Sequence, residues 1–169
     1  MDQKVRRMVL AALLAALCCA ATLVVSIPAP TGYVNLGDCV VLLSGWLLGP
    51  VWGGAAAGIG TMLADLFHGY AAYAPATLVI KFLMAAAAVL TLGRGAGERG
   101  LLLPAAAGAT AAEGIMAGGY FLYESLILGV GTAAVASVPA NLVQGAVGGV
   151  AGVAVLLMLE RSRALERLK

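Results

Sequence analysis

Five ionisable side chains lie inside long apolar stretches of this chain, whereas nearly every other charged residue lies near an end or in one short loop. The five are Asp38, Asp65, Lys81, Glu113 and Glu124. A charged side chain at the centre of a bilayer costs about 2.5 kcal/mol or more, so such residues face a protein interior, a partner or a water-filled cavity. The pattern therefore predicts an integral membrane protein with a polar interior.

The composition agrees with that prediction. The chain is 62% hydrophobic and 11% charged, whereas soluble domains are about 25% charged. Its 169 residues suit one domain, residues 1–169, with room for about six spans of roughly 20 residues each. We expect an all-α polytopic bundle.

Turn residues and charges divide the apolar sequence into six segments, the second of them short. It reaches only roughly 20 Å at about 1.5 Å per residue, which is less than a bilayer requires. A re-entrant hairpin is the alternative for this part of the chain, because Gly49 and Pro50 form a turn after it. The predicted segments are residues 8–27, 36–48, 51–67, 75–92, 101–128 and 136–159.

Basic residues favour six spans over five. Nine of the ten Lys and Arg residues lie before the first segment, between the fourth and fifth, or after the sixth. Six spans place all nine on one side, which the positive-inside rule assigns to the cytoplasm together with both termini. These residues are Lys4, Arg6, Arg7, Arg94, Arg99, Arg161, Arg163, Arg167 and Lys169.

Small residues recur at one-turn spacing on several segments. Gly54 and Gly58, like the overlapping pairs among residues 145–152, let helix backbones approach closely, and packing inside the bundle is favoured over dimerisation. The first segment carries a broader alanine surface, which either packs inside the bundle or docks another membrane protein. It is formed by Ala11, Ala12, Ala15, Ala16 and Ala20.

Polar and aromatic side chains gather in the outer half of the predicted bundle, while the inner half is almost purely apolar. This distribution predicts a pocket open to the outside, because a continuous pore needs polar residues through both halves. Asp65 and Glu113 are expected to shape the pocket. The candidate ligand contacts are Tyr33, Asn35, Asp38, Tyr73, Lys81, Tyr120, Glu124, Asn141 and Gln144.

Structural roles remain open for many of these residues. Lys81 is expected to be held by a carboxylate, with Asp65 as the favoured partner, and Asp38 is also placed to cap the second helix. Glu113 is equally suited to a helix-packing hydrogen bond. Asn141 and Gln144 could instead form hydrogen bonds between helices. Tyr33 and Tyr73 could instead be aromatic residues of the membrane interface.

Catalytic and cofactor-binding patterns are poorly supported. The chain has no phosphate-binding P-loop, and the segment from Asn35 to Asp38 lacks the first glycine of the Gly-x-Gly-Asp motif of intramembrane aspartyl proteases. The spacing of Cys18, Cys19 and Cys39 matches neither a disulfide framework nor a zinc site. We expect no enzymatic activity, no metal, no cofactor and no nucleic-acid partner.

Several stretches, in order along almost the whole chain, resemble the S components of energy-coupling factor (ECF) transporters. The likeness is greatest for the riboflavin-transporter-like group, which also contains proposed hydroxymethylpyrimidine and vitamin B6 carriers. The stretches are residues 32–38, 48–50, 64–66, 73–75, 80–81, 119–124 and 139–144.

The resemblance implies a multi-pass subunit of a prokaryotic plasma membrane that captures a vitamin-like solute, of thiamine-pyrimidine or vitamin B6 type. The solute lies in the outer half under a lid formed by the loop after the first span. The subunit then topples against a transmembrane coupling subunit, which docks on the alanine surface, and two ATPase subunits drive the cycle. The competing hypothesis is a small membrane scaffold or homo-oligomeric channel without ATPase partners.

Overall fold

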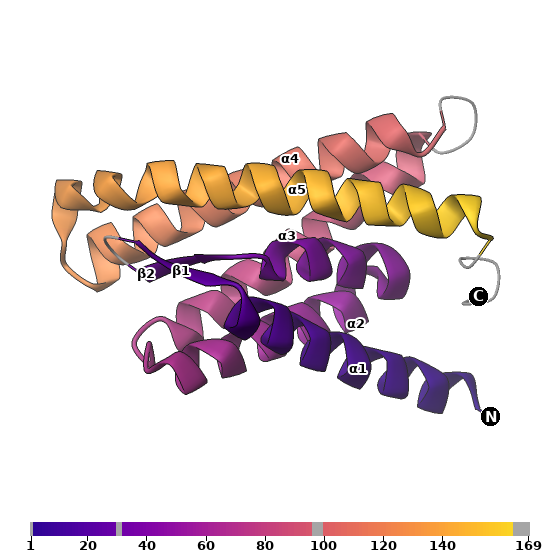
Figure 1. Ribbon diagram of the computed structural model, residues 1–169, viewed down its shortest axis with the longest axis horizontal. Coiled ribbons are helices and arrows are strands. Elements are labelled where there is room, and N and C mark those ends of the chain that lie inside the picture. Colours follow the sequence, from indigo (N-terminus) through magenta and orange to yellow (C-terminus); the bar gives the residue numbers. More distant parts are fainter. Residues whose placement is uncertain (1, 30–31, 96–99, 164–169) are drawn as a thin grey trace.

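The computed structural model describes residues 2–29, 32–95 and 100–163. Its described part is helical apart from one small β-hairpin, which confirms the expected all-α class (Figure 1). The elements are α1 (Gln3–Val24), β1 (Ser26–Ala29), β2 (Gly32–Asn35), α2 (Gly37–His68), α3 (Ala74–Gly95), α4 (Leu102–Leu122), a π-helical turn (Tyr123–Ile127), a 3-10 helix (Gly131–Ser137) and α5 (Val138–Arg161).

Helix α2 folds back on itself at Gly49, where the sequence predicts a turn. Gly49 has φ 81° and ψ 179°, a conformation that glycine tolerates and other residues rarely adopt. A Cβ on Gly53 would lie 2.2 Å from the carbonyl oxygen of Ser44, although nine residues of straight helix would separate the two by about 13 Å. The two arms of α2 therefore run antiparallel, and the first arm is short.

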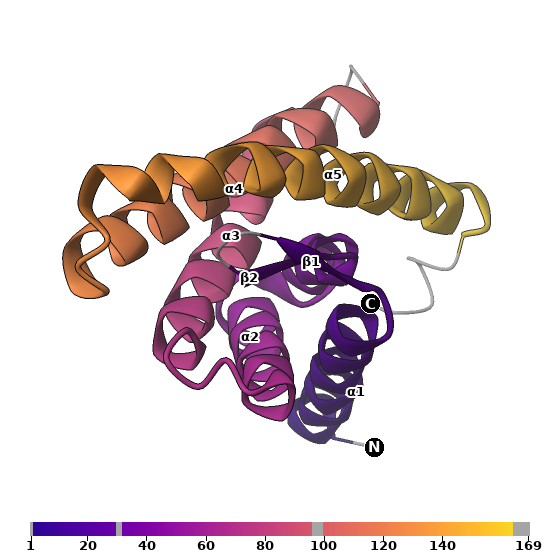
Figure 2. The same cartoon turned by 60° about the vertical axis from the view of Figure 1, so that its left-hand side comes forward.

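The helices form two groups, one of α1, α2 and α3 and one of α4 and α5, which Figure 2 shows in a second view. Helix α2 packs between α1 and α3, and α4 packs against both α3 and α5. Glycines allow the close approaches: a Cβ on Gly45 would lie 2.1 Å from the carbonyl oxygen of Ala85, and one on Gly58 would lie 2.5 Å from that of Leu78. Gly58 is one of the small residues predicted to pack inside the bundle, and a Cβ on the predicted Gly148 and Gly152 would likewise lie 2.7 Å and 3.1 Å from the side chains of Asp38 and Leu42.

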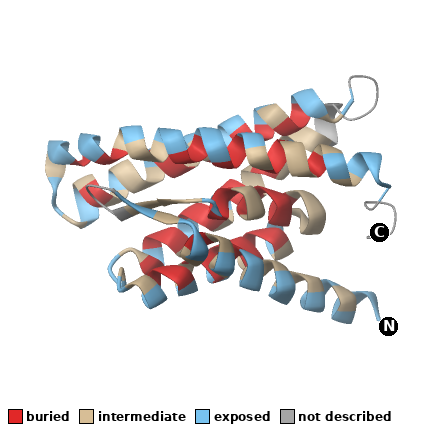
Figure 3. Cartoon of the chain, in the orientation of Figure 1, coloured by how far each residue is buried: buried red, intermediate tan, exposed pale blue. Residues whose placement is uncertain are grey.

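Apolar side chains cover the outside of the bundle as well as its core. Buried residues face the centre of each helix group, while exposed ones face outward (Figure 3). Many of the exposed residues are large and apolar, among them Leu90, Leu126 and Val150. Four stretches of the described residues are long and apolar enough to cross a membrane: Gln3–Val24, Gly37–His68, Ala74–Leu92 and Gly131–Arg161. The surface is that of a protein solvated by lipid.

The β-hairpin after α1 was not predicted from the sequence. Strands β1 and β2 are antiparallel, with Ile27 opposite Val34 and Pro28 opposite Tyr33. Prolines suggested a loop here, but a two-stranded ribbon consists only of edge strands, which tolerate proline. In Figure 1 the hairpin lies between the two helix groups, away from the end of the molecule that carries the two chain termini.

The start of α1 and the end of α5 lie at the same end of the molecule (Figure 1). This end carries Lys4, Arg6, Arg7 and Arg161. The side chain of Arg94, together with Arg99, Arg167 and Lys169, lies outside the described residues. Three predicted boundaries shift. The first segment ends as a helix at Val24, so that Ile27 lies in β1. The fifth segment leaves the α-helix at Leu122 instead of continuing to residue 128, and α5 begins at Val138 after a 3-10 helix.

Candidate ligand-binding site

A cavity of about 60 Å³ lies beneath the hairpin. Its wall combines residues from all five α-helices, from β2 and from the 3-10 helix. Eight of the nine predicted ligand contacts line it, Asp38 being the exception, and so does Asp65. The lining residues are Thr22, Tyr33, Asn35, Thr61, Asp65, Tyr70, Tyr73, Thr77, Lys81, Tyr120, Glu124, Ser137, Ala140, Asn141 and Gln144.

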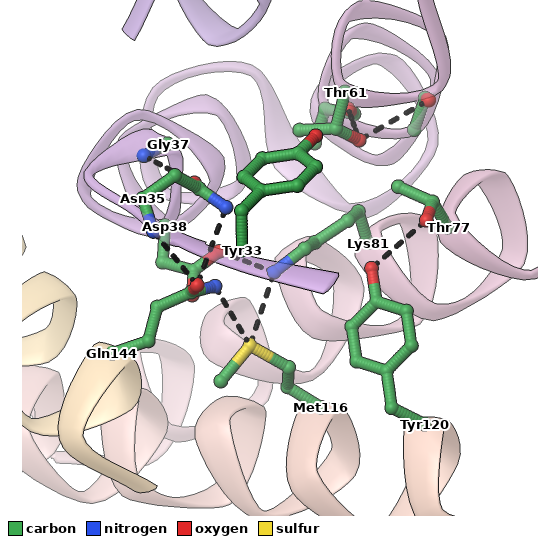
Figure 4. Close-up of polar contacts among 12 residues, drawn as sticks. Tyr33, Asn35, Gly37, Asp38, Thr61, Thr77, Lys81, Met116, Tyr120 and Gln144 are labelled. Carbon is green, nitrogen blue, oxygen red and sulfur yellow. Dashed lines mark hydrogen bonds and ion pairs between the residues drawn. The ribbon is translucent and has the colours of Figure 1, made fainter. Parts of the chain in front are cut away.

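A buried ion pair, here called the floor of the cavity, joins Lys81 of the cavity lining to Asp38 behind it (Figure 4). The ammonium of Lys81 binds Oδ1 of Asp38, and Nε2 of Gln144 donates to Oδ2 of the same carboxylate at 2.7 Å. Both donors also approach Sδ of Met116, at 3.1 Å and 3.3 Å. Asp38 and Lys81 are 0% and 2% exposed, so neither charged group is hydrated. The ion pair and the hydrogen bonds of this network take the place of the lost hydrogen bonds to water.

The predicted pairing of Lys81 with Asp65 was wrong. Asp65 instead accepts a hydrogen bond from the hydroxyl of Tyr33 at 2.6 Å. Asp38 lies at the start of the first arm of α2 and Asp65 near the end of the second arm. Because the arms are antiparallel, position along the helices favours neither carboxylate, and the rotation of each helix decides. Asp38 is also not the cap of α2, because Leu36 occupies that position without a side-chain hydrogen bond.

Gln144 joins the floor of the cavity to the hairpin above it. While its amide nitrogen holds Asp38, its Oε1 accepts hydrogen bonds from the backbone N–H of Asn35 at 2.9 Å and from Nδ2 of Asn35 at 3.2 Å. The carbonyl oxygen of the Asn35 side chain in turn accepts from the backbone N–H of Gly37 at 2.8 Å. Gln144 is thus a structural link as well as a lining residue.

Four tyrosines form a continuous aromatic wall. The ring centroids are 5.3 Å apart for Tyr33 and Tyr70, 6.1 Å for Tyr70 and Tyr73, and 6.4 Å for Tyr73 and Tyr120. These separations suit tilted and edge-to-face aromatic contacts. The ammonium of Lys81 lies 5.8 Å from the centre of the Tyr120 ring, so the wall and the floor meet at Tyr120.

Two tyrosine hydroxyls hold carboxylates of the cavity. Besides the Tyr33–Asp65 bond, Tyr73 donates to Oε1 of Glu124 at 3.2 Å. Burial, reinforced by the charge of Glu124, raises the pKa of Tyr73 to about 12. Burial and the bond to Asp65 raise the pKa of Tyr33 as well. Both hydroxyls therefore stay protonated and act as donors at neutral pH.

The π-helical turn at the end of α4 carries Glu124 into the cavity wall. The turn spans Tyr123–Ile127, and Glu124 is 2% exposed. Such turns widen a helix by one residue and are frequent at functional sites. The hydroxyl of Tyr123 donates to the carbonyl oxygen of Ala72, which fixes this turn against the start of α3.

Three polar atoms of the cavity wall have no hydrogen-bond partner within the described part of the chain. They are Oγ1 of Thr22, Oδ2 of Asp65 and Oε2 of Glu124. The side chain of Asn141, which is half-buried, also has no hydrogen bond to a described residue. Buried polar atoms are nearly always paired, so these groups are candidates to contact a ligand.

Glu113 does not belong to this cavity. It lies seven residues below Tyr120, about 10 Å along the helix, and borders a separate groove of about 710 Å³ between α4 and α5. Both of its carboxylate oxygens are buried without a partner among the described residues. The structure thus places Glu113 outside the pocket that it was expected to shape, although it shares a helical face with Tyr120.

Four hydroxyl residues of the cavity wall were missed in the sequence: Thr22, Thr61, Thr77 and Ser137. Three of them carry a usable signal, because each precedes a predicted residue by four positions, as Thr61 precedes Asp65. Residues four apart share a helical face. Thr22 has no such neighbour.

The alanine surface of α1 forms one side of a groove on the surface of the bundle, which has a volume of about 630 Å³ and whose other side is formed by α2. Ala12 and Ala16 are exposed, whereas Ala11 and Ala15 are half-buried. A Cβ on Gly60 would lie 2.2 Å from the carbonyl oxygen of Ala15, so one edge of the predicted surface packs inside the bundle. The groove is lined by Ala11, Ala12, Ala15, Ala16, Cys19, Ala20, Leu23, Trp52, Ala55, Ala56, Ile59 and Leu63.

Comparisons with known proteins match almost the whole chain. The family model described as "ECF-type riboflavin transporter, S component" matches residues 2–161. A solved structure, "Structure and mechanism of the S component of a bacterial ECF transporter", superposes with a TM-score of 0.65 over 96% of this chain and 97% of that chain, at 22% identity. At that identity the likeness concerns the fold alone.

One curated relative matches a shorter stretch. An "Uncharacterized protein in gap 3'region" of Pyrococcus woesei is 49% identical over 57 residues, which are 34% of this chain and 38% of that protein. The match therefore spans little more than a third of the relative.

Proposed function

Because the chain belongs to the family of S components of ECF-type riboflavin transporters, we propose that it captures a vitamin-like small molecule from outside the cell and delivers it to an ECF importer. The family is membrane-embedded, and four stretches of the described residues are long and apolar enough to cross a membrane. The observation that carries the proposal is the polar and aromatic cavity beneath the hairpin. Its wall combines aromatic rings with a few polar side chains, the lining that is typical of ligand sites.

The proposed topology has six crossings, with both termini in the cytoplasm. The two antiparallel arms of α2 supply the second and third crossings, and α4 supplies the fifth. The cluster of basic residues at the shared end of α1 and α5 supports a cytoplasmic position for that end. The cavity and the hairpin then face outward.

The proposed substrate is a vitamin or modified-base precursor, with thiamine-pyrimidine and vitamin B6 types favoured. The description of the matching family names riboflavin, so riboflavin is included among the ligands in the binding tests. Aromatic walls of the kind formed by Tyr70, Tyr73 and Tyr120 suit flat heterocyclic rings. The hairpin residues Tyr33 and Asn35 provide the lid.

The proposed partners are a transmembrane coupling subunit and two ATPase subunits. The chain has no P-loop of its own, so ATP hydrolysis falls to other subunits. The alanine groove between α1 and α2 is the proposed docking surface for the coupling subunit, because small residues let helices approach closely in lipid.

Copurification separates this proposal from the competing scaffold or channel. When the chain is expressed with a coupling subunit and the ATPases, we expect a stable complex and ATP-dependent uptake of a vitamin. A scaffold or homo-oligomeric channel would purify only with copies of itself. That outcome would contradict the proposed function.

Asn141 provides a direct test of the cavity. We expect Asn141→Ala to weaken vitamin binding by roughly threefold to tenfold, the effect of losing one hydrogen bond of about 0.5–1.5 kcal/mol. Leu142→Ala is the matched control, because Leu142 is 58% exposed on the same turn. Titration calorimetry of the two purified variants measures their affinities for the vitamin. Equal affinities would show that Asn141 does not contact the ligand.

A further inference from the structure

The cavity contains two carboxylates that are each held by one oxygen and open at the other. Tyr33 donates to Oδ1 of Asp65 and Tyr73 donates to Oε1 of Glu124. Oδ2 of Asp65 and Oε2 of Glu124 are buried without a partner. Both residues line the cavity and are 5% and 2% exposed, so water does not readily satisfy either oxygen.

The charge of the cavity is unbalanced. Among its described lining residues, Lys81 is the only cation, and its ammonium is already committed to Asp38. The charges of Asp65 and Glu124 therefore remain to be compensated. A buried carboxylate is stabilised by opposite charge and by hydrogen-bond donors, and destabilised by another anion.

The aromatic wall runs from one of these carboxylates to the other. Tyr33 is bonded to Asp65, Tyr73 is bonded to Glu124, and Tyr70 bridges the two rings with centroid distances of 5.3 Å and 6.1 Å. A flat ligand lying against this wall would have Asp65 at one end and Glu124 at the other. An ammonium on such a ligand also gains from the faces of the tyrosines.

We propose that this cavity selects a flat heterocycle that carries hydrogen-bond donors or a positive charge at two separate edges, one for Asp65 and one for Glu124. This inference rests on the proposed function and gives its substrate a chemical class. Ligands with a carboxylate or phosphate are rejected, because either group would meet two buried carboxylates with no free cation to offset the repulsion. Rejection by unfavourable charge is a common source of specificity.

Matched vitamin B6 derivatives test the charge rule on one ring. Pyridoxamine carries an aminomethyl group where 4-pyridoxic acid carries a carboxylate, and pyridoxine is paired with pyridoxine 5′-phosphate in the same way. The panel also includes 4-amino-5-hydroxymethyl-2-methylpyrimidine and riboflavin. Titration calorimetry with purified full-length protein at pH 7 measures the affinities. The donor-bearing member of a pair should bind at least tenfold more tightly than its anionic counterpart, a difference in binding free energy of about 1.4 kcal/mol.

Amide variants test whether the two carboxylates cause the preference. Glu124→Gln and Asp65→Asn keep the shape of the side chain and remove its charge, whereas Glu160→Gln removes an exposed charge at the other end of α5. We expect each cavity variant to weaken pyridoxamine binding by tenfold or more and to narrow its preference over 4-pyridoxic acid, while Glu160→Gln changes neither. Retained thermal unfolding transitions show that the variants are folded.

Several outcomes overturn the inference. An anionic probe that binds as tightly as its donor-bearing counterpart contradicts it, as does a preference that survives both amide variants. If none of the donor-bearing probes binds although the chain copurifies with a coupling subunit, the donor rule fails and the proposed function stands. If the chain binds no probe and also fails to copurify, the proposed function fails and the inference fails with it.

Discussion

Replacing Lys81 by methionine is expected to destabilise the folded protein by about 3–5 kcal/mol, because the variant leaves Asp38 as a buried charge without its partner. Asp38 is 0% exposed, and its remaining donor is the amide of Gln144. Replacing Asp38 by leucine should cost a similar amount by leaving the ammonium of Lys81 unpaired. The double variant should lose less than the sum of the two, since a buried pair can be exchanged for apolar residues at little cost.

Unfolding of the purified protein in detergent measures all three variants. Lys81→Met combined with Asp65→Leu is the matched control, because Asp65 bonds Tyr33 and not Lys81. The effects of this control pair should add more nearly than those of Lys81 and Asp38. Simple additivity for Lys81 with Asp38 would show that the pair contributes nothing to stability.

The same ion pair shows what the sequence could not determine. Five charges in apolar segments were enough to predict a polar interior, and the expected depths of polar and aromatic side chains grouped eight residues that line one cavity. The choice between Asp38 and Asp65 as partner of Lys81 depends on how each helix is rotated about its axis. Rotation is set by glycine contacts such as Gly148, whose Cβ would lie 2.7 Å from Cβ of Asp38, and no single segment contains that information.

Replacing Ala16 by tryptophan is expected to abolish uptake while leaving ligand affinity within about twofold, since surface substitutions away from a site usually change free energies by less than 0.5 kcal/mol. Ala16 is exposed and lines the groove between α1 and α2. An indole there would hold a partner helix away from the groove, which only small side chains leave open. Ala15 is a poorer target, because its backbone packs against Gly60.

Leu13→Trp is the control for this prediction. Leu13 is 56% exposed on α1 and does not line the groove, so the variant should assemble and transport normally. Copurification with the coupling subunit, binding by calorimetry and uptake into vesicles are measured for both variants. Normal uptake by Ala16→Trp would exclude the groove as the docking surface, and lost affinity in an assembled complex would contradict the separation of docking from binding.

The helices were more predictable than the segment that closes the cavity. Apolar runs and the Gly49–Pro50 turn gave the helical segments to within a few residues, apart from the end of α4. The hairpin at residues 26–35 was missed, because Pro28 and its neighbours resemble a loop and the strands are held by distant contacts. Chief among these is Gln144, whose Oε1 accepts from Asn35 across 109 positions. Such contacts depend on the assembled bundle and not on local propensity.

Helix α1 takes part in both of the surfaces described above. Thr22 lines the cavity, while Cys19 and Leu23, on the adjoining turns, line the outer alanine groove. A change at one surface that shifts this helix also shifts the other, and thermodynamic linkage makes the effect reciprocal: the factor by which an occupied cavity alters docking equals the factor by which docking alters occupancy. A coupling subunit that prefers the helix position of the empty cavity would therefore loosen the cargo simply by binding, so that capture and unloading become two states of a single shared helix.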